Sequence, residues 1–227
     1  MLVKENENIE IYLLKIEIEN TGHITNTYVL KDKETNNLLV IDPAYDGDQI
    51  GRELKIIGGK LESVVVTHSH ADHIAGLAKL VNRTNSKVYI HELDENGLYN
   101  PTLNEEEIVK TKVELVNEQN VITVKDKYKI KIGNIVLEIM HTPGHTKGSI
   151  ILYNKQQNIL FSGDTIFENT YGRTDLVSSK PEKMKETLDR IFETFEDIQV
   201  YPGHGNIFDL EKAKRRIKLL FAFKEGK

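Results

Sequence analysis

The stretch THSHADH, residues 67–73, decides how this chain is interpreted. Three histidines and one aspartate lie between His68 and His73, directly after the apolar run 61–66. Imidazole nitrogens and carboxylate oxygens are the ligands that suit Zn²⁺ and related divalent ions. The apolar run reads as a buried strand, and helical spacing resumes at Asp72. The stretch therefore predicts a metal site at a strand-to-helix junction.

Three more candidate ligands stand alone further along the chain, each at the end of an apolar run and beside a glycine. They are His145, Asp164 and His204. Glycine lets the backbone approach a site closely, and loops at strand ends often carry function. Together with the first stretch, the predicted ligands of two metal ions are His68, His70, Asp72, His73, His145, Asp164 and His204.

Spacing divides the first four ligands between two ions. His68 and His70 are two residues apart and can reach one ion together, whereas Asp72 and His73 begin the next helix and can reach a second ion. Ions in such pairs lie about 3.5–4 Å apart. A divalent ion makes hydroxide available near neutral pH, and Asp72 is the predicted catalytic residue that orients it or moves a proton to the leaving group. Hydrolysis of an ester, thioester, lactone or phosphodiester fits this chemistry.

The remaining histidines are expected to have other roles. His23 is predicted to be exposed, or at most at the rim of the site. His91 is predicted to begin a short helix as a cap or surface residue. His141 is predicted to be structural rather than a ligand.

Composition limits the function classes. The 227 residues carry a net charge of −5, with both signs mixed along the chain, so no basic stripe for nucleic acid stands out. No cysteine is present, which excludes disulfides, thiolate catalysis and thiolate metal ligands. Without a membrane-length apolar run or a signal-peptide pattern, we expect no membrane partner and, by default, a cytoplasmic location. The oligomeric state is not indicated.

The order of predicted elements favours an α+β fold of a single domain spanning residues 1–227. Alternation and apolar runs predict two blocks of strands, each followed by helices, which suggests sheet packed on sheet with helices outside. The predicted strands are 9–18, 26–30, 38–41, 61–66, 87–90, 128–132, 136–141, 149–153, 159–162 and 199–201. The predicted helices are 46–57, 72–81, 91–98, 181–195 and 210–223, with 101–111 either a loop or a surface helix.

The ordered motif resembles the metallo-β-lactamase superfamily across nearly the whole chain. The resemblance implies an αββα sandwich of two mixed sheets, with metals at one edge of both. It implies that one metal is held by His68, His70 and His145, and the other by Asp72, His73 and His204, with Asp164 bridging. Zn²⁺, two per chain, is the implied cofactor. Asp164 and the absence of cysteine argue against β-lactamase activity.

The segment 163–175, with its Gly-Asp-Thr-Ile-Phe and Gly-Arg-Thr-Asp phrases, resembles the glyoxalase II-like group. That likeness implies hydrolysis of a small acyl thioester or ester, in the manner of hydroxyacylglutathione hydrolases. Arg173 is the candidate for pairing with a substrate carboxylate, with a structural salt bridge to Asp175 as the alternative, and Tyr171 is a candidate pocket residue. The chain ends 23 residues after His204, so the usual helical C-terminal domain that helps hold glutathione is not expected.

Two other activities remain open. Persulfide dioxygenases of this fold share the Gly-Arg-Thr-Asp segment and bind one Fe²⁺ through residues matching His68, His145 and Asp164. Lactonases tend to carry tyrosine three residues after the bridging aspartate; this chain has Phe167 there, which disfavours that activity. A non-catalytic binding module is the third alternative.

Overall fold

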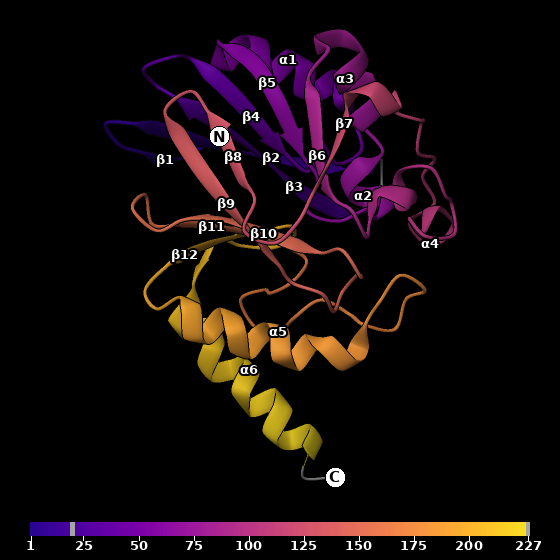
Figure 1. Ribbon diagram of the computed structural model, residues 1–227, viewed down its shortest axis with the longest axis vertical. Coiled ribbons are helices and arrows are strands. Elements are labelled where there is room, and N and C mark those ends of the chain that lie inside the picture. The colour runs from indigo at the N-terminus through magenta and orange to yellow at the C-terminus, as the bar shows by residue number, and fades with distance from the viewer. Residues whose placement is uncertain (19–20, 226–227) are drawn as a thin grey trace.

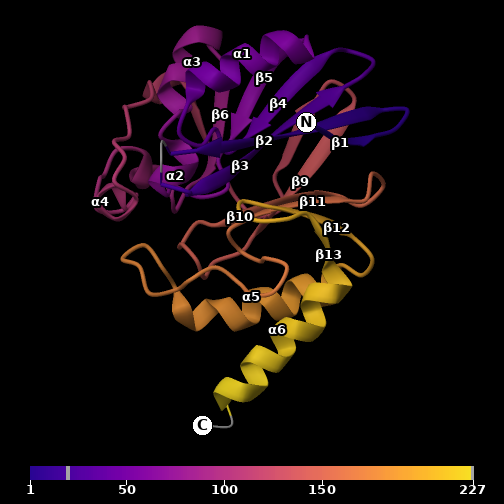
Figure 2. The same ribbon diagram turned by 180° about the vertical axis from the view of Figure 1, so that it is seen from behind.

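Two β-sheets pack face to face, and helices cover their outer faces (Figure 1). The structure, a computed structural model, describes residues 1–18 and 21–225. The layers run helix, sheet, sheet, helix from one side of the molecule to the other, and Figure 2 shows the same order from behind. The predicted αββα sandwich of two mixed sheets is confirmed.

The first sheet has seven strands in sequence order. They are β1 (Leu2–Glu5), β2 (Ile9–Glu17), β3 (Ile24–Asp32), β4 (Asn37–Ile41), β5 (Lys60–Val65), β6 (Lys87–His91) and β7 (Val121–Val124). Strands β1 to β4 pair antiparallel, and β4 to β7 pair parallel. Parallel neighbours require long crossovers. The first two crossovers contain α1 (Gly47–Ile57), α2 (Ala71–Ile74) and α3 (Leu77–Thr84), and the last contains η1 (Glu95–Leu98), α4 (Glu106–Val109) and η2 (Glu118–Asn120).

The second sheet has six strands in the order β13-β12-β11-β10-β9-β8. They are β8 (Lys129–Ile132), β9 (Ile135–His141), β10 (Ile150–Asn154), β11 (Ile159–Gly163), β12 (Gln199–Pro202) and β13 (Phe208–Asp209). All neighbours are antiparallel except β11 and β12, which are joined through α5 (Pro181–Thr194). Helix α6 (Leu210–Glu225) follows β13 and leads away from the sheet toward the C-terminus (Figures 1 and 2).

Apolar side chains fill the space between the sheets. Tyr28 of the first sheet packs against Phe161 and Tyr201 of the second, with ring centroids 5.3 Å and 5.6 Å from the Tyr28 ring. Two further apolar clusters join each sheet to its helices. Burial of this apolar surface is the main favourable term in folding. The cluster between the sheets holds them face to face, and the other two hold the helices on the outer faces.

Most sequence-predicted elements are confirmed to within a few residues, and the misses are short. Strands β1, β7 and β13, which have two to four residues and lie at sheet edges, were not predicted. Histidine 91 ends β6, so only Glu95–Leu98 of the helix predicted for 91–98 is present. Among the described residues, no helix is both long and apolar enough to cross a membrane. That residues 1–227 form one domain stays a prediction.

The helix predicted for 72–81 is interrupted, and Gly76 explains the interruption. Helix α2 ends at Ile74 and α3 begins at Leu77. At Gly76 the chain passes so close to the start of α1 that an added Cβ atom would lie 2.5 Å from the Pro43 carbonyl oxygen and 2.7 Å from the Gly47 nitrogen. Only glycine permits this approach, which holds the short helix α2 against α1.

Replacing Gly76 should therefore destabilise the fold through steric overlap alone. Gly76→Ala is expected to lower the free energy of unfolding by about 1–3 kcal/mol, the usual range for overpacking. Gly51→Ala is the matched control, because Gly51 lies inside α1 with nothing within 4 Å of an added Cβ. That change should instead stabilise the protein by about 0.5–1 kcal/mol. Urea unfolding of both variants measures the difference, and equal stability of the two would contradict the explanation.

Candidate metal centre

All seven predicted ligands meet at one edge of the two sheets. His68 and His70 lie in the loop after β5, and Asp72 and His73 lie in α2. The other three follow strands of the second sheet: His145 comes after β9, Asp164 after β11 and His204 after β12. Those three strands run in the same direction, since β9 and β11 are each antiparallel to β10 and β12 is parallel to β11. Their C-terminal ends therefore open at the same edge.

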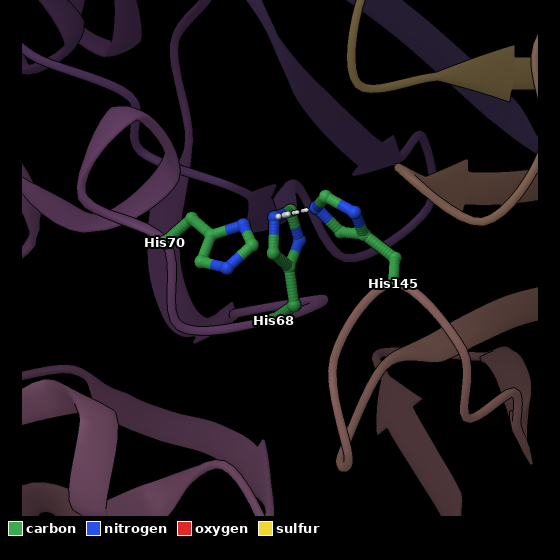
Figure 3. Close-up of side chains that lie close together, drawn as sticks. All are labelled: His68, His70 and His145. Atoms are coloured by element: carbon green, nitrogen blue, oxygen red, sulfur yellow. Dashed lines mark hydrogen bonds between the residues drawn. The ribbon is translucent and has the colours of Figure 1, made fainter. Parts of the chain in front are cut away.

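His68, His70 and His145 form the first group, with the His68 ring in the middle (Figure 3). The ring centroid of His68 lies 4.7 Å from that of His70 and 4.7 Å from that of His145. Each residue offers a ring nitrogen, and these nitrogens lie within 4.8 Å of one another. All three residues are buried. The arrangement fits a single cation held by three imidazoles.

Hydrogen bonds on the far side of the rings fix which nitrogen carries the proton. The Thr67 hydroxyl donates to Asp42 Oδ2 at 2.7 Å, so it can only accept from His68 Nδ1, which lies 3.1 Å away. His145 Nδ1 donates to the Arg173 carbonyl at 2.8 Å. In the neutral rings both Nε2 atoms then carry lone pairs, yet they lie 3.2 Å apart (dashed in Figure 3). A shared cation fits this arrangement.

The second group brings Asp72, His73 and His204 around Asp164. His204 Nε2 lies 3.1 Å from Asp72 Oδ2 and 3.4 Å from Asp164 Oδ2, and His73 Nε2 lies 3.4 Å from Asp164 Oδ1. Asp164 also approaches the first group, with its Oδ2 3.7 Å from His145 Nε2. Asp164 Oδ1 is buried and makes no hydrogen bond. A buried carboxylate oxygen without a donor is costly, and a divalent cation would satisfy it.

Charge in this cluster is strongly coupled. Burial would lower the pKa of His204, but Asp164 and Asp72 raise it to about 10. Burial likewise opposes the raised pKa of His73, which Asp72 and Asp164 hold well above its usual value. Burial would raise the pKa of Asp164, yet His204 and His73 hold it well below its usual range. Protons and metal ions therefore compete for the same atoms.

The first group behaves differently because it has fewer carboxylate neighbours. Burial, followed by the charge of His145, lowers the pKa of His70 to about 3. Burial also lowers the pKa of His68 well below its usual value. These rings are therefore neutral near pH 7, which is the state that binds a metal. His70 Nε2 lies 2.9 Å from the Ser178 hydroxyl, which leaves its Nδ1 as the metal-facing atom.

The buried carboxylate of Asp42 orients the ligands, and its part was not predicted. Its Oδ1 accepts from the Thr67 backbone nitrogen at 2.7 Å, and its Oδ2 lies 2.9 Å from His73 Nδ1. A carboxylate behind a ligating histidine fixes the tautomer and the ring orientation. The available signal was the Asp-Pro pair immediately after the apolar run 38–41.

Asp94 joins the two ligand loops and was also missed. Its Oδ2 accepts from the Ser69 nitrogen at 3.1 Å and from the Thr146 hydroxyl at 2.7 Å, and its Oδ1 accepts from the Gly148 nitrogen at 2.7 Å. Burial raises the pKa of Asp94 despite these bonds. Nothing local in the sequence marks this aspartate, because its partners lie 25 to 54 residues away.

A cavity of about 670 Å³ opens beside the cluster. It is lined by His23, His70, Asp72, Glu105, Ile108, Val109, His145, Asp164, Phe167, Glu168, Asn169, Thr170, Gly172, Arg173, Leu176, His204, Gly205 and Asn206. Cavities of this size hold small-molecule ligands. The cluster thus faces a space that a substrate can enter.

The predicted substrate residues behave differently from each other. Arg173 lines the cavity. Its guanidinium donates to both carboxylate oxygens of Asp175, at 2.7 Å and 2.8 Å, which is the salt bridge predicted as the alternative role of Arg173. Tyr171 is not part of the lining. It pairs with Ile166 and packs against the cluster beneath the second sheet. His23 lies at the rim as expected, half-exposed, with Nε2 3.4 Å from Asp72 Oδ2.

The sequence model of the Metallo-beta-lactamase superfamily matches residues 20–204, which contain every predicted ligand. The chain belongs to this superfamily. It is 29% identical over 168 residues to the "Probable metallo-hydrolase YqgX" of Bacillus subtilis, with 74% of this chain and 79% of the relative covered. It is 32% identical over 178 residues to a hydroxyacylglutathione hydrolase of Francisella tularensis subsp. novicida, with 78% of this chain and 61% of that protein covered.

Solved structures of the superfamily superpose on this chain. The B3 metallo-beta-lactamase BLEG-1 has a TM-score of 0.80 at 25% identity, covering 92% of this chain and 99% of that one. ETHE1 from Myxococcus xanthus has a TM-score of 0.68 at 25% identity, covering 90% and 82%. Together with the cluster of histidines and aspartates, these similarities identify the chain as a member of the metallo-hydrolase superfamily that has a metal-binding site.

If Asp164 bridges two ions, removing its charge should weaken both. Asp164→Asn keeps the size of the side chain but is expected to reduce bound metal from about two ions per chain to below one, because the bridging carboxylate is lost. Asp189→Asn, an exposed carboxylate on α5 outside the cavity lining, is the control and should keep full occupancy. Elemental analysis after dialysis measures both. Unchanged metal content in Asp164→Asn would refute the bridging assignment.

One prediction in this region was wrong. His91 is neither a helix cap nor a surface residue; it is the buried last residue of β6. Its ring stacks on that of His141, with centroids 3.9 Å apart and planes 10° from parallel. His141 lies outside the ligand groups and its Nε2 donates to the Lys147 carbonyl at 2.8 Å, consistent with a structural role. The pair joins the first sheet to the second.

The stacked pair should make stability depend on pH. Burial, followed by the neighbouring His141, lowers the pKa of His91 from 6.5 to about 4. Between these two values the unfolded chain binds more protons than the folded chain. The contribution of His91 to the free energy of unfolding is therefore fully present above pH 6.5 and is lost as the pH falls toward 4. His91→Asn, which keeps an acceptor for the Leu93 nitrogen, should flatten this fall. Urea midpoints of both proteins between pH 7 and pH 4 test it, and parallel curves would contradict it.

Proposed function

We propose that this protein is a metal-dependent hydrolase that cleaves a small acyl thioester or ester, in the manner of hydroxyacylglutathione hydrolases, with two Zn²⁺ per chain. The observation that carries the proposal is the position of Asp164. Its two carboxylate oxygens lie 3.4 Å from His73 Nε2 and 3.7 Å from His145 Nε2, so it contacts both ligand groups. A carboxylate between two such groups supports a two-ion site.

The residues supply the other parts of a hydrolytic site. When bound, divalent ions supply Lewis acidity, which lowers the pKa of water and polarises an acyl carbonyl. Asp72 lines the cavity, and its Oδ2 lies between His204 Nε2 and His23 Nε2. From there the carboxylate is placed to orient the attacking water, or to carry a proton to the leaving group later in the reaction. The neighbouring charge of His73 holds the pKa of Asp72 well below its usual range despite burial, so the carboxylate is ionised and able to bind a cation.

One relative supports the cleavage of an acyl thioester. The Francisella relative is named as a hydroxyacylglutathione hydrolase, and the chain matches it across 61% of its length. The segments that suggested this group from sequence are Gly163–Phe167, which contains Asp164, and Gly172–Asp175. Because both segments lie at the cavity or beside it, they support a related reaction at this site.

The decisive test is hydrolysis by protein of known metal content. We expect about two zincs per chain and kcat/KM above about 10⁴ M⁻¹s⁻¹ for at least one acyl thioester or ester, within the range of natural substrates. Chelation should abolish the activity and Zn²⁺ should restore it. Asp72→Asn should lower kcat by about 10²–10⁴-fold, the usual contribution of a general acid or base. Asp189→Asn, at an exposed position of α5 outside the cavity lining, is the control for a general loss of charge, and absence of turnover with every thioester and ester would reject the proposal.

A second candidate is a mononuclear iron persulfide dioxygenase, the alternative suggested by the segment 172–175. The structural likeness to ETHE1 is compatible with it. His68, His145 and Asp164 are the residues that would hold Fe²⁺ in that case, and they are adjacent in the cluster. Protein that contains one iron and consumes oxygen with a persulfide would favour this activity. A lactonase is the remaining alternative, and Phe167 lies in the cavity lining at the position that tyrosine tends to occupy there.

A further inference from the structure

We propose that the cavity beside the metal cluster binds an apolar, uncharged chain of the substrate, so that the substrates are esters or thioesters carrying aliphatic groups rather than anionic glutathione conjugates. This inference rests on the proposed hydrolase function, because it names the substrate class of the same site. It is argued from two properties of the cavity wall, its apolar surface and its charges.

The outer part of the wall is apolar and is formed by two segments far apart in the sequence. Ile108 and Val109 come from α4, whereas Phe167 and Leu176 come from the segment between β11 and α5. Both views show these segments at the same edge of the molecule (Figures 1 and 2). Glu105 joins them, since its Oε1 accepts from the Val177 nitrogen at 3.2 Å.

Solvent reaches this apolar wall. Ile108 is 57% exposed although it is a large aliphatic residue, and it is part of a cavity lining that continues to the metal ligands. Covering such surface with an aliphatic chain is favourable in proportion to the area removed from water. Apolar surface of this kind, next to a few polar groups that fix orientation, is typical of ligand sites.

The charges of the lining disfavour an anionic substrate. Beyond the metal cluster, the charged residues that line the cavity are Glu105, Glu168 and Arg173. The guanidinium of Arg173, the one cation of this set in the described part of the chain, is bound through two hydrogen bonds to Asp175. Of the two acids, Glu168 lies 3.6 Å from the guanidinium of Arg216, whereas Glu105 is buried in the wall. A carboxylate of a glutathione group would therefore meet the charge of Glu105 and a cation that is already paired. An uncharged chain avoids this repulsion.

Binding of straight-chain carboxylates to the zinc-loaded protein tests the apolar wall without turnover. The carboxylate occupies the metal end, and the chain is left to contact the wall. From acetate to octanoate we expect affinity to rise by about three- to fourfold for each methylene that is fully buried. Calorimetry is the suitable method because the chain contains no tryptophan. An affinity that does not change with chain length overturns the inference.

Matched ligands and variants distinguish binding at this wall from nonspecific hydrophobic binding elsewhere on the protein. Adipate should bind more weakly than hexanoate, because its second carboxylate would lie in the apolar wall beside the acidic Glu105. Ile108→Ala and Leu176→Ala should each reduce the gain per methylene. Ile56→Ala is the control, since Ile56 is 78% exposed on α1 and is not part of the cavity lining. An equal loss in Ile56→Ala, or tighter binding of adipate, counts against the inference.

Turnover then distinguishes this inference from the proposed function. Neutral thioesters and esters with acyl chains from acetyl to octanoyl are compared with S-lactoylglutathione on the same preparation. A rise in kcat/KM with chain length supports both. High activity on S-lactoylglutathione, with no dependence on chain length, upholds the hydrolase and overturns the apolar chain. Chain-dependent carboxylate binding without any hydrolysis upholds the apolar wall and rejects the hydrolase.

Discussion

The buried carboxylate of Asp42 is the constraint on which the metal centre depends. It accepts from the backbone nitrogen and the hydroxyl of Thr67, and it contacts Nδ1 of His73. The first two bonds fix the start of the ligand loop, and the Thr67 hydroxyl in turn fixes the tautomer of His68. A single carboxylate at the end of β4 thus orients one ligand of each group. Loss of such a partner leaves the histidines free to turn away from a metal.

The two sheets are tied together where the ligands converge. The Thr67 carbonyl accepts from the Ile150 nitrogen at 2.9 Å, and the Gly203 carbonyl accepts from the Asn26 nitrogen at 2.7 Å. Glycine is needed here, because a Cβ at Gly203 would collide with Asp164 Oδ1 and would lie 2.6 Å from His73 Cε1. These backbone contacts bring the charged ligands together in the interior of the protein. Removing those charges from water costs free energy, and the burial of the apolar layers offsets this cost.

Specificity lies outside this rigid frame. The ligands come from strand ends and α2, whereas the outer cavity wall comes from α4 and the segment after β11. Connecting segments can change without disturbing a packed core, so one metal centre can serve many substrates. This division explains why family membership identifies the chemistry of the site more firmly than its substrate. In this chain the wall carries aliphatic surface and acidic groups, which distinguishes it from a site built for anions.

The sequence by itself determined the layered fold and the seven candidate ligands. Both depend on local patterns: alternation and apolar runs mark strands, and the ligands of residues 68–73 are adjacent along the chain. Only the tertiary structure decided the rest. Three of these features join residues that are far apart in sequence: the partners of Asp94, the stacking of His91 on His141, and the pairing between Glu105 and Val177. The exclusion of Tyr171 from the cavity depends on how the second sheet packs on its helices. Spacing along a chain carries no information about such contacts, because they form only when separate elements pack together.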